Sequence, residues 1–127
     1  MADKKKILII EDDRAMVDSL TVLLKKDYEM SSAKDGVEGM KKAAEINPDL
    51  IILDLLMPEK DGFAVSRELK DDKKLKKIPV IALSSFTELH GMSFGDDAGK
   101  SSLPTEVYLT KPVDPPTLLR LIKKYLK

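Results

Sequence analysis

Acidic side chains follow two short apolar runs in this sequence. The pair Glu11 and Asp12 comes directly after residues 7–10, and Asp54 comes directly after residues 50–53. If both runs are neighbouring strands of a parallel sheet, their carboxyl ends meet in one crevice, which is where such sheets bind ligands. Carboxylates this close repel one another, so a partly desolvated one takes up a proton unless a cation neutralises it. Mg²⁺ is the cation that such oxygen ligands favour.

A hydroxyl and an ammonium group occupy the ends of two further expected strands. Ser84 follows the apolar residues 80–83, and Lys111 follows residues 107–110. A cation, an ammonium group and a hydroxyl that converge on a carboxylate form a site suited to phosphoryl transfer, in which the protein positions the reactants and neutralises charge. Asp54 is then the predicted nucleophile, which forms an acyl phosphate.

Each of these residues also has an ordinary structural explanation. The acids at 11–13 favour the N-terminus of a following helix. Ser84 can be a strand-end hydroxyl, and Lys111 can be a surface lysine before a proline. One such residue alone would not indicate a function. The agreement of four strand ends that face one crevice favours the chemical interpretation over these separate explanations.

The composition limits the class of protein. A chain of 127 residues is expected to form one domain with a single core. The 22 acidic and 22 basic residues balance, which argues against nucleic-acid binding through overall charge. The absence of cysteine excludes disulfides, thiolate nucleophiles and cysteine metal sites. The short apolar runs predict no membrane span and no signal peptide, so we expect a cytoplasmic protein.

The apolar runs alternate with stretches of helical periodicity. This alternation predicts an α/β fold with a doubly wound parallel sheet, because helices that connect parallel strands cover both faces. For five strands we expect the flavodoxin-like order 2-1-3-4-5, which makes the first and third strands neighbours. The expected strands are residues 7–10, 28–32, 50–54, 79–84 and 107–110, and the expected helices begin near residues 14, 35, 62 and 114.

Apolar spacing also predicts which helical side chains face the sheet. Asp13, Asp35 and Asp114 are each placed to cap the helix that follows. Residues 70–77 are predicted to be a solvated, mostly basic connection. The predicted inward-facing residues are Met16, Leu20 and Leu23 with Val17 and Leu24 beside them in the first helix, Val37, Met40 and Ala44 in the second, Phe63, Val65 and Leu69 in the third, and Leu118, Leu119, Ile122 and Leu126 in the last.

The order and spacing of these motifs resemble those of bacterial two-component response regulators, whose receiver domains include the chemotaxis receivers. The resemblance covers nearly the whole chain, which is therefore expected to be a single receiver domain, residues 1–127. The residues that carry it are the acid pair Glu11 and Asp12, the segment Asp54–Gly62, the hydroxyl of Ser84, and the segment Tyr108–Pro112.

The resemblance implies a phosphoacceptor and a metal site. Asp54 would accept a phosphoryl group from the phosphohistidine of a sensor histidine kinase or a phosphotransfer protein. Asp12 and Asp54 would ligate Mg²⁺, Glu11 would assist through water, and the backbone carbonyl of Leu56 would complete the protein ligands. The chain would then be a regulatory domain that promotes only its own phosphorylation and dephosphorylation.

The resemblance also implies a conformational switch. Lys111 would contact the phosphoryl group, and Ser84 and Tyr108 would couple phosphorylation to a change in shape. The expected downstream partner is a protein, with no direct binding of nucleic acid or membrane. No residue pattern indicates which kinase or which target is involved. The chain is either a single-domain regulator or a piece of a larger protein.

One segment departs from the family pattern. Residues 85–104 form a longer connection than is usual, and Gly91, Gly95, Gly99 and Pro104 interrupt any helical periodicity. The family's fourth helix, a main output surface, would run through this segment. We therefore expect an irregular fourth crossover, which affects the output mechanism but not the phosphorylation chemistry.

Three alternatives compete with this interpretation. Residues 95–101 imitate a phosphate-binding loop, but the glycine spacing is one residue short and two aspartates would repel phosphate. His90, the single histidine, lies in the irregular segment and is a weak candidate for a relay histidine. The strongest rival is a receiver fold that serves as a docking module and is not phosphorylated in normal use.

Overall fold

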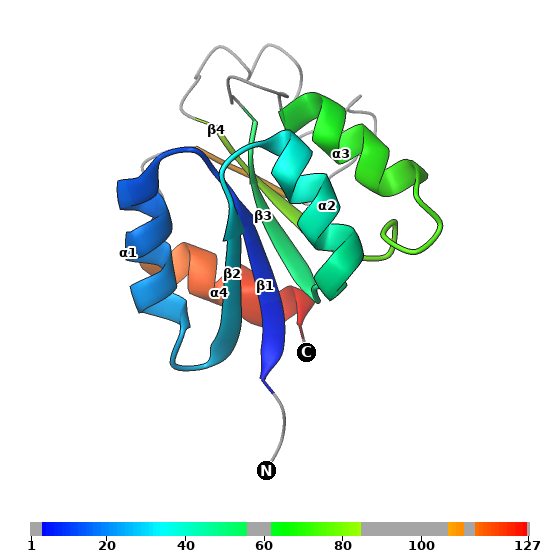
Figure 1. The fold of residues 1–127 in the computed structure, drawn as a ribbon. Helices are drawn as coiled ribbons and strands as arrows, with labels where there is room; N and C mark the ends of the chain where they lie inside the picture. The colour runs from blue at the N-terminus through cyan, green and yellow to red at the C-terminus, as the bar shows by residue number, and fades with distance from the viewer. Residues whose placement is uncertain (1–3, 56–61, 85–106, 111–113, 127) are drawn as a thin grey trace.

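The computed structural model describes residues 4–55, 62–84, 107–110 and 114–126, and their elements follow the predicted alternation of strand and helix (Figure 1). The expected irregular crossover at residues 85–104 lies outside the described residues. In chain order the elements are β1 (Lys5–Ile10), α1 (Arg14–Leu24), β2 (Tyr28–Ala33), α2 (Gly36–Ile46), β3 (Leu50–Asp54), α3 (Gly62–Asp71), β4 (Val80–Ser84), β5 (Val107–Thr110) and α4 (Pro115–Tyr125).

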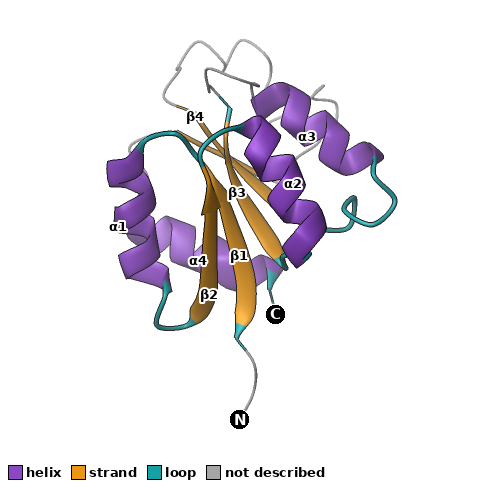
Figure 2. Ribbon diagram, in the orientation of Figure 1, coloured by secondary structure: helices purple, strands orange, loops and turns teal. Residues whose placement is uncertain are grey.

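The five strands form one parallel sheet in the order β2-β1-β3-β4-β5, which confirms the predicted topology. Figure 2 shows helices on both faces of this sheet, with α1 and α4 on one side and α2 and α3 on the other. Successive residues of a strand point to opposite faces. The central strands are therefore apolar at every position, because each face is covered by helices. Among the described residues, no helix has the length and apolar content needed to cross a membrane.

The layer formed by α1 and α4 packs large side chains against the sheet. In α1 the buried residues are Val17, Leu20 and Leu24, whereas Met16 and Leu23 are only partly buried. The inward face of α1 is therefore rotated slightly from the predicted one. In α4 the predicted face is confirmed, and its buried and partly buried residues are Leu118, Ile122, Leu119 and Leu126.

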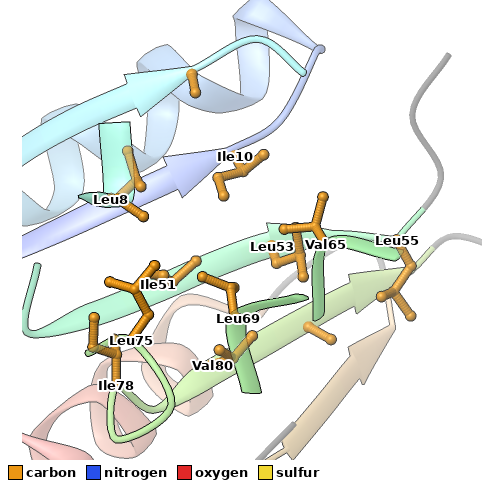
Figure 3. Packing of buried hydrophobic residues seen from close by; sticks show 13 residues of the cluster. Leu8, Ile10, Ile51, Leu53, Leu55, Val65, Leu69, Leu75, Ile78 and Val80 are labelled. Atoms are coloured by element: carbon orange, nitrogen blue, oxygen red, sulfur yellow. The ribbon is translucent and has the colours of Figure 1, made fainter. Parts of the chain in front are cut away.

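The layer formed by α2 and α3 buries a second apolar cluster against the sheet (Figure 3). The predicted inward face of α2 is confirmed at Met40, which packs against this cluster, but was wrong at Val37, which is 62% exposed, and at Ala44, which is also exposed. Gly36, Gly39 and Ala43 are buried instead. A Cβ atom added at Gly39 would lie 2.6 Å from Cδ1 of Ile10, so the helix backbone lies directly on a β1 side chain. Small residues mark this face because larger ones would push the helix away from the sheet.

Two turns fix the position of β3 in the centre of the sheet. Asn47 ends α2 in the left-handed conformation, at φ 50°, just before Pro48. The backbone N–H of Lys6 donates to Oδ2 of Asp49 at 2.8 Å, and the N–H of Asp49 donates to the carbonyl of Lys6 at 2.8 Å. These two hydrogen bonds tie the start of β3 to β1 and so set the register that brings their far ends together.

The connection between α3 and β4 is only partly solvated, which corrects the prediction for residues 70–77. Its lysines at positions 73, 74, 76 and 77 are exposed, as predicted. Leu75, however, is 2% exposed and packs with Ile78 in the core cluster under α2 and α3. The connection is therefore anchored to the core at two points.

Candidate functional site

The acidic residues singled out from the sequence meet at the carboxyl end of the sheet. The ladder between β1 and β3 pairs Ile10 with Leu53, so the next residues, Glu11 and Asp54, leave neighbouring strands at the same edge. The N–H of Glu11 donates to the carbonyl of Ala33 on β2 at 3.0 Å. Hydrogen bonding between the strands therefore continues to the acidic residues and fixes their backbone.

Glu11, Asp12 and Asp54 form a group that we term the acidic cluster. Each offers one carboxylate oxygen, and these oxygens all lie within 4.8 Å of one another. Glu11 is 1% exposed and Asp54 is 3% exposed, whereas Asp12 is exposed. The cluster thus has a buried part on the strand ends and one carboxylate that faces solvent.

Asp13 has a different role from its two acidic neighbours. Its Oδ1 accepts from the N–H groups of Ala15 at 3.0 Å and Met16 at 3.3 Å, which confirms the predicted N-cap of α1. The N–H of Asp13 donates to Oε2 of Glu11 at 3.2 Å. The cap therefore holds the start of α1 and also contacts the acidic cluster.

The acidic cluster fits a magnesium ion. Mg²⁺ binds oxygens at about 2.1 Å, so two oxygens on opposite sides of one ion lie about 4.2 Å apart. The separation of up to 4.8 Å in the cluster is close to this value, so only small side-chain movements are needed. The donors are hard oxygen ligands, and the exposed Asp12 leaves room for the waters that Mg²⁺ retains.

The other predicted site residues are placed less completely. Ser84 is the last residue of β4 and pairs with Thr110 of β5, so its backbone lies at the same edge of the sheet. Tyr108 pairs with Ala82 within the sheet. The side-chain positions of Ser84 and Tyr108 are outside what the structure describes, and Leu56 and Lys111 lie outside the described residues altogether.

Sequence reasoning missed one buried polar side chain. Among the described residues, the buried polar or charged side chains are Glu11, Asp54 and Ser66. Ser66 lies on α3, next to Val65 and three residues before Leu69, both of which are buried. This spacing is the signal that could have placed Ser66 on the inward face. A serine without a neighbouring motif gave no chemical reason to single it out.

Comparison with known proteins shows a consistent set of relatives. The family model described as the response regulator receiver domain matches residues 7–123. The chain is 36% identical over 123 residues to the DNA-binding dual master transcriptional regulator RpaA of Synechocystis sp. (strain ATCC 27184 / PCC 6803 / Kazusa). It is 34% identical over 123 residues to the polar-differentiation response regulator DivK of Brucella ovis (strain ATCC 25840 / 63/290 / NCTC 10512).

These two relatives differ in length. The matched segment is 96% of this chain in both comparisons, but it spans 49% of RpaA and 96% of DivK. The chain thus spans about half the length of the first relative and nearly all of the second. RpaA shares only this region with the present chain, so its DNA binding is not carried over.

Solved structures give the same result. The response regulator protein TrrA from Thermotoga maritima, in complex with Mg²⁺–BeF, has a TM-score of 0.80 and 30% identity, with 96% of this chain and 99% of that one covered. The chemotaxis response regulator CheY4 of Vibrio cholerae has a TM-score of 0.82 and 26% identity, with 97% and 99% covered. Phosphorylation and Mg²⁺ binding are general features of this family. The chain belongs to the response regulator receiver domain family of two-component signalling systems.

Proposed function

We propose that Asp54 is the phosphoacceptor of a signalling switch and that the acidic cluster holds the Mg²⁺ ion on which its phosphorylation depends. The observation that carries the proposal is the convergence of Glu11, Asp12 and Asp54 within 4.8 Å, at the carboxyl ends of two neighbouring strands. Membership of the receiver family supports the same assignment.

Asp54 is the cluster member best positioned to act as the nucleophile. It ends the central strand β3, between β1 and β4, and pairs with Leu83 of β4. The next residue, Leu55, donates its N–H to the carbonyl of Leu83 at 2.9 Å, so the backbone is fixed on both sides of Asp54. A rigid strand end reduces the entropy lost when the reacting atoms are brought into line.

The proposed reaction is a direct transfer of the phosphoryl group. A carboxylate oxygen of Asp54 attacks phosphorus, a new P–O bond forms, and the P–N bond to the donor imidazole breaks. The imidazole leaves with the electron pair of that bond and then takes up a proton from solvent. The product on this chain is an acyl phosphate.

Asp12 and Asp54 are the proposed carboxylate ligands of Mg²⁺, with Glu11 assisting through a water molecule and the backbone carbonyl of Leu56 as a further ligand. When bound, the ion would neutralise the charge of the acids and of the incoming phosphoryl oxygens. Without the ion, the burial of Glu11 and Asp54 restricts the movement of their side chains near the exposed Asp12.

Lys111 is proposed to contact the phosphoryl group, with Ser84 and Tyr108 as the switch. Phosphorylation would shift an existing equilibrium between two conformations, and the shift is limited by the difference in interaction energy between them. Residues 1–127 would act as one receiver domain in the cytoplasm. Its partners would be a sensor histidine kinase or phosphotransfer protein and a downstream target protein, and its only catalysis would be on its own phosphoryl group.

The decisive test is covalent modification of the purified protein with acetyl phosphate. In the presence of Mg²⁺, we expect intact-protein mass spectrometry to show the addition of one phosphoryl group. Asp54→Asn should abolish the adduct, and Asp12→Asn or removal of divalent ions should greatly slow its formation. An adduct that forms equally well in Asp54→Asn would refute the assignment of the phosphoacceptor.

Asp13→Asn is the matched control. It removes a negative charge next to Asp12 but keeps a side-chain oxygen that can cap α1, because asparagine is also a favoured N-cap residue. Phosphorylation of this variant should be close to that of the wild type. If the wild type forms no adduct at all, while binding of a downstream partner is the same with and without Asp54→Asn, the chain is instead a docking module that is not phosphorylated.

A further inference from the structure

A hollow of about 350 Å³ lies at the amino ends of β3 and β4, away from the acidic cluster. Its lining residues come from the end of α2 and from the connection between α3 and β4, and Figure 1 shows these two segments at the right of the sheet. Because parallel strands carry the acidic cluster at their carboxyl ends, the hollow lies at the opposite end of the sheet. Its lining residues are Ala44, Asn47, Asp72, Lys73, Lys74, Leu75 and Lys77.

The connection that lines the hollow, residues 72–77, is termed the lysine loop, and its backbone is held in place. Oδ1 of Asp72 accepts from the N–H groups of Lys74 at 2.8 Å and Leu75 at 3.0 Å. The side chain of Lys70 donates to the carbonyls of Lys76 at 3.3 Å and Ile78 at 3.1 Å. With Leu75 also buried in the core, the loop loses little backbone freedom on binding a partner.

The charge of this loop is out of proportion to that of the chain. Residues 72–77 contain four lysines and one aspartate, although acids and bases balance over the whole sequence. The side chains of Lys73, Lys74, Lys76 and Lys77 are exposed. Within the part of the chain that the structure describes, none of these four ammonium groups forms an ion pair or a hydrogen bond. Their charges are therefore directed to solvent around the hollow.

Stabilisation of helix ends does not account for this arrangement. Lysines favour the C-terminus of a helix, but the effect falls off within the last turn. Lys70 already occupies the last turn of α3, which ends at Asp71. At the end of α2, the N–H of Asn47 already donates to the carbonyl of Ala43 at 2.9 Å. The lysines beyond these positions have no comparable role in the fold.

We propose that this hollow docks an acidic segment of a partner protein. Its volume lies at the lower end of the range of about 300–1,000 Å³ that is typical of small binding pockets. The lining combines three ammonium groups with one carboxylate, that of Asp72, whose Oδ1 accepts from N–H groups of the loop itself. With the methyl group of Ala44 and the amide of Asn47, this net positive lining suits carboxylate side chains next to small apolar or polar ones. A nucleic acid fits less well, because the chain has no net charge and this one loop offers few phosphate contacts.

The proposed docking does not depend on phosphorylation of Asp54. The acidic cluster and the lysine loop lie at opposite ends of β3 and β4, so a partner on the loop leaves the phosphoacceptor accessible. The same partner can therefore remain bound while Asp54 gains or loses its phosphoryl group. A segment of this kind would recruit the domain to its kinase or target without competing for the acidic cluster.

The test is a titration of the isotopically labelled protein with a synthetic peptide of glutamate, aspartate, alanine and leucine, followed by amide chemical shifts. We expect shifts at residues 44–47 and 72–78, with affinity that falls as salt is raised. Replacing Lys73, Lys74 and Lys77 together by glutamine should weaken binding about tenfold, since each exposed ion pair contributes only modestly. Asp54→Asn should bind as tightly as the wild type.

The matched control replaces Lys25, Lys26 and Lys123, three exposed lysines elsewhere, by glutamine. An equal loss of affinity in this control would mean that overall charge attracts the peptide, and it would overturn the proposal. The absence of shifts at residues 44–47 and 72–78 at millimolar peptide would also overturn it. A DNA duplex or inorganic diphosphate that binds the same residues more tightly than the peptide would reject the acidic protein segment as the occupant.

Discussion

Two helices on opposite faces of the sheet, α1 and α2, cover it with different kinds of side chain. On one face, α1 and α4 bury large aliphatic residues such as Leu20, Leu24 and Ile122. On the other, α2 buries Gly39 and Ala43, and its backbone lies against a side chain of β1. The buried strand residues under α1 are Ile and Leu throughout, whereas those under α2 and α3 also include Ala33, Val80 and Ala82. The smaller residues of the sheet therefore lie on the same side as the small residues of α2.

This difference shows that the distance between a helix and the sheet decides which types of residue lie on the buried face of the helix. Where large side chains hold a helix away from the sheet, the apolar periodicity and the buried face nearly coincide. Where the helix backbone comes close, a large residue does not fit and a glycine is buried instead. In α2, the residue with the most apolar side chain in the first turn, Val37, consequently points to solvent.

The largest expected effect is in the layer of large side chains. Leu24→Ala removes a side chain with no exposed surface, and we expect a loss of about 2–5 kcal/mol in the free energy of unfolding. Leu23→Ala is the matched control, because Leu23 is only partly buried and its truncation should cost less. Urea denaturation of both variants measures the difference. Equal losses would mean that the inward face of α1 has been assigned wrongly.

The second expected effect is at the buried face of α2, where Gly39 lies on Ile10. Gly39→Ala places a Cβ atom 2.6 Å from Cδ1 of Ile10, so we expect a loss of about 1–3 kcal/mol in unfolding free energy despite the better helix propensity of alanine. Ile10→Val removes Cδ1 and should reduce the cost of Gly39→Ala in a double-mutant cycle. Stabilisation by Gly39→Ala alone would show that α2 has room to move away from the sheet.

Much of the fold was predictable because its signals are local. Each buried strand is a short apolar run, and the parallel order follows from the alternation of strands and helices. The caps at Asp13, Asp35 and Asp114 were predictable from residue type and position alone, and all three are confirmed. The meeting of Asp54 with Glu11 followed from the strand order, because acids at the ends of neighbouring parallel strands share one edge.

The features that could not be predicted depend on contacts between distant residues. The burial of Gly39 depends on its distance from Ile10, which the sequence of α2 does not contain. Leu75 is a single leucine among lysines, so no periodicity indicates that it reaches the core. The roles of Ser84 and Lys111 in the site remain predictions, since they depend on side-chain positions beyond the described residues.

A smaller effect on stability concerns the N-cap of α4, in the layer formed by α1 and α4, and depends on pH. The hydroxyl of Thr117 donates to Asp114 at 2.6 Å and its N–H donates at 3.0 Å, and these hydrogen bonds lower the pKa of Asp114 from its ordinary value of 3.8. Because the pKa of Asp114 is lower in the folded state, its charge stabilises the fold at pH values above its pKa in the unfolded chain. This stability is lost as the pH falls through the pKa of the folded state.

We therefore expect the stability advantage of the wild type over Asp114→Asn to be present at neutral pH and to shrink in acid. Denaturation at neutral pH and at about pH 3 measures the change. Thr117→Val removes the hydroxyl donor and should reduce the pH dependence of the wild-type cap. An advantage over Asp114→Asn that is the same at both pH values would contradict the charge-dependent cap.

The smallest expected effect tests the corrected face of α2 directly. Val37 is 62% exposed, so Val37→Ala removes little buried surface, and the higher helix propensity of alanine offsets part of any loss. We expect the unfolding free energy to change by less than about 0.5 kcal/mol.

The same substitution at Val17, which is 6% exposed on α1, should cost about 1–3 kcal/mol, because two buried methyl groups are lost and a small cavity remains. The two variants share their chemistry and differ only in the layer and the face, so their difference isolates burial. A cost at Val37 as large as that at Val17 would return Val37 to the inward face and remove the contrast between the two layers.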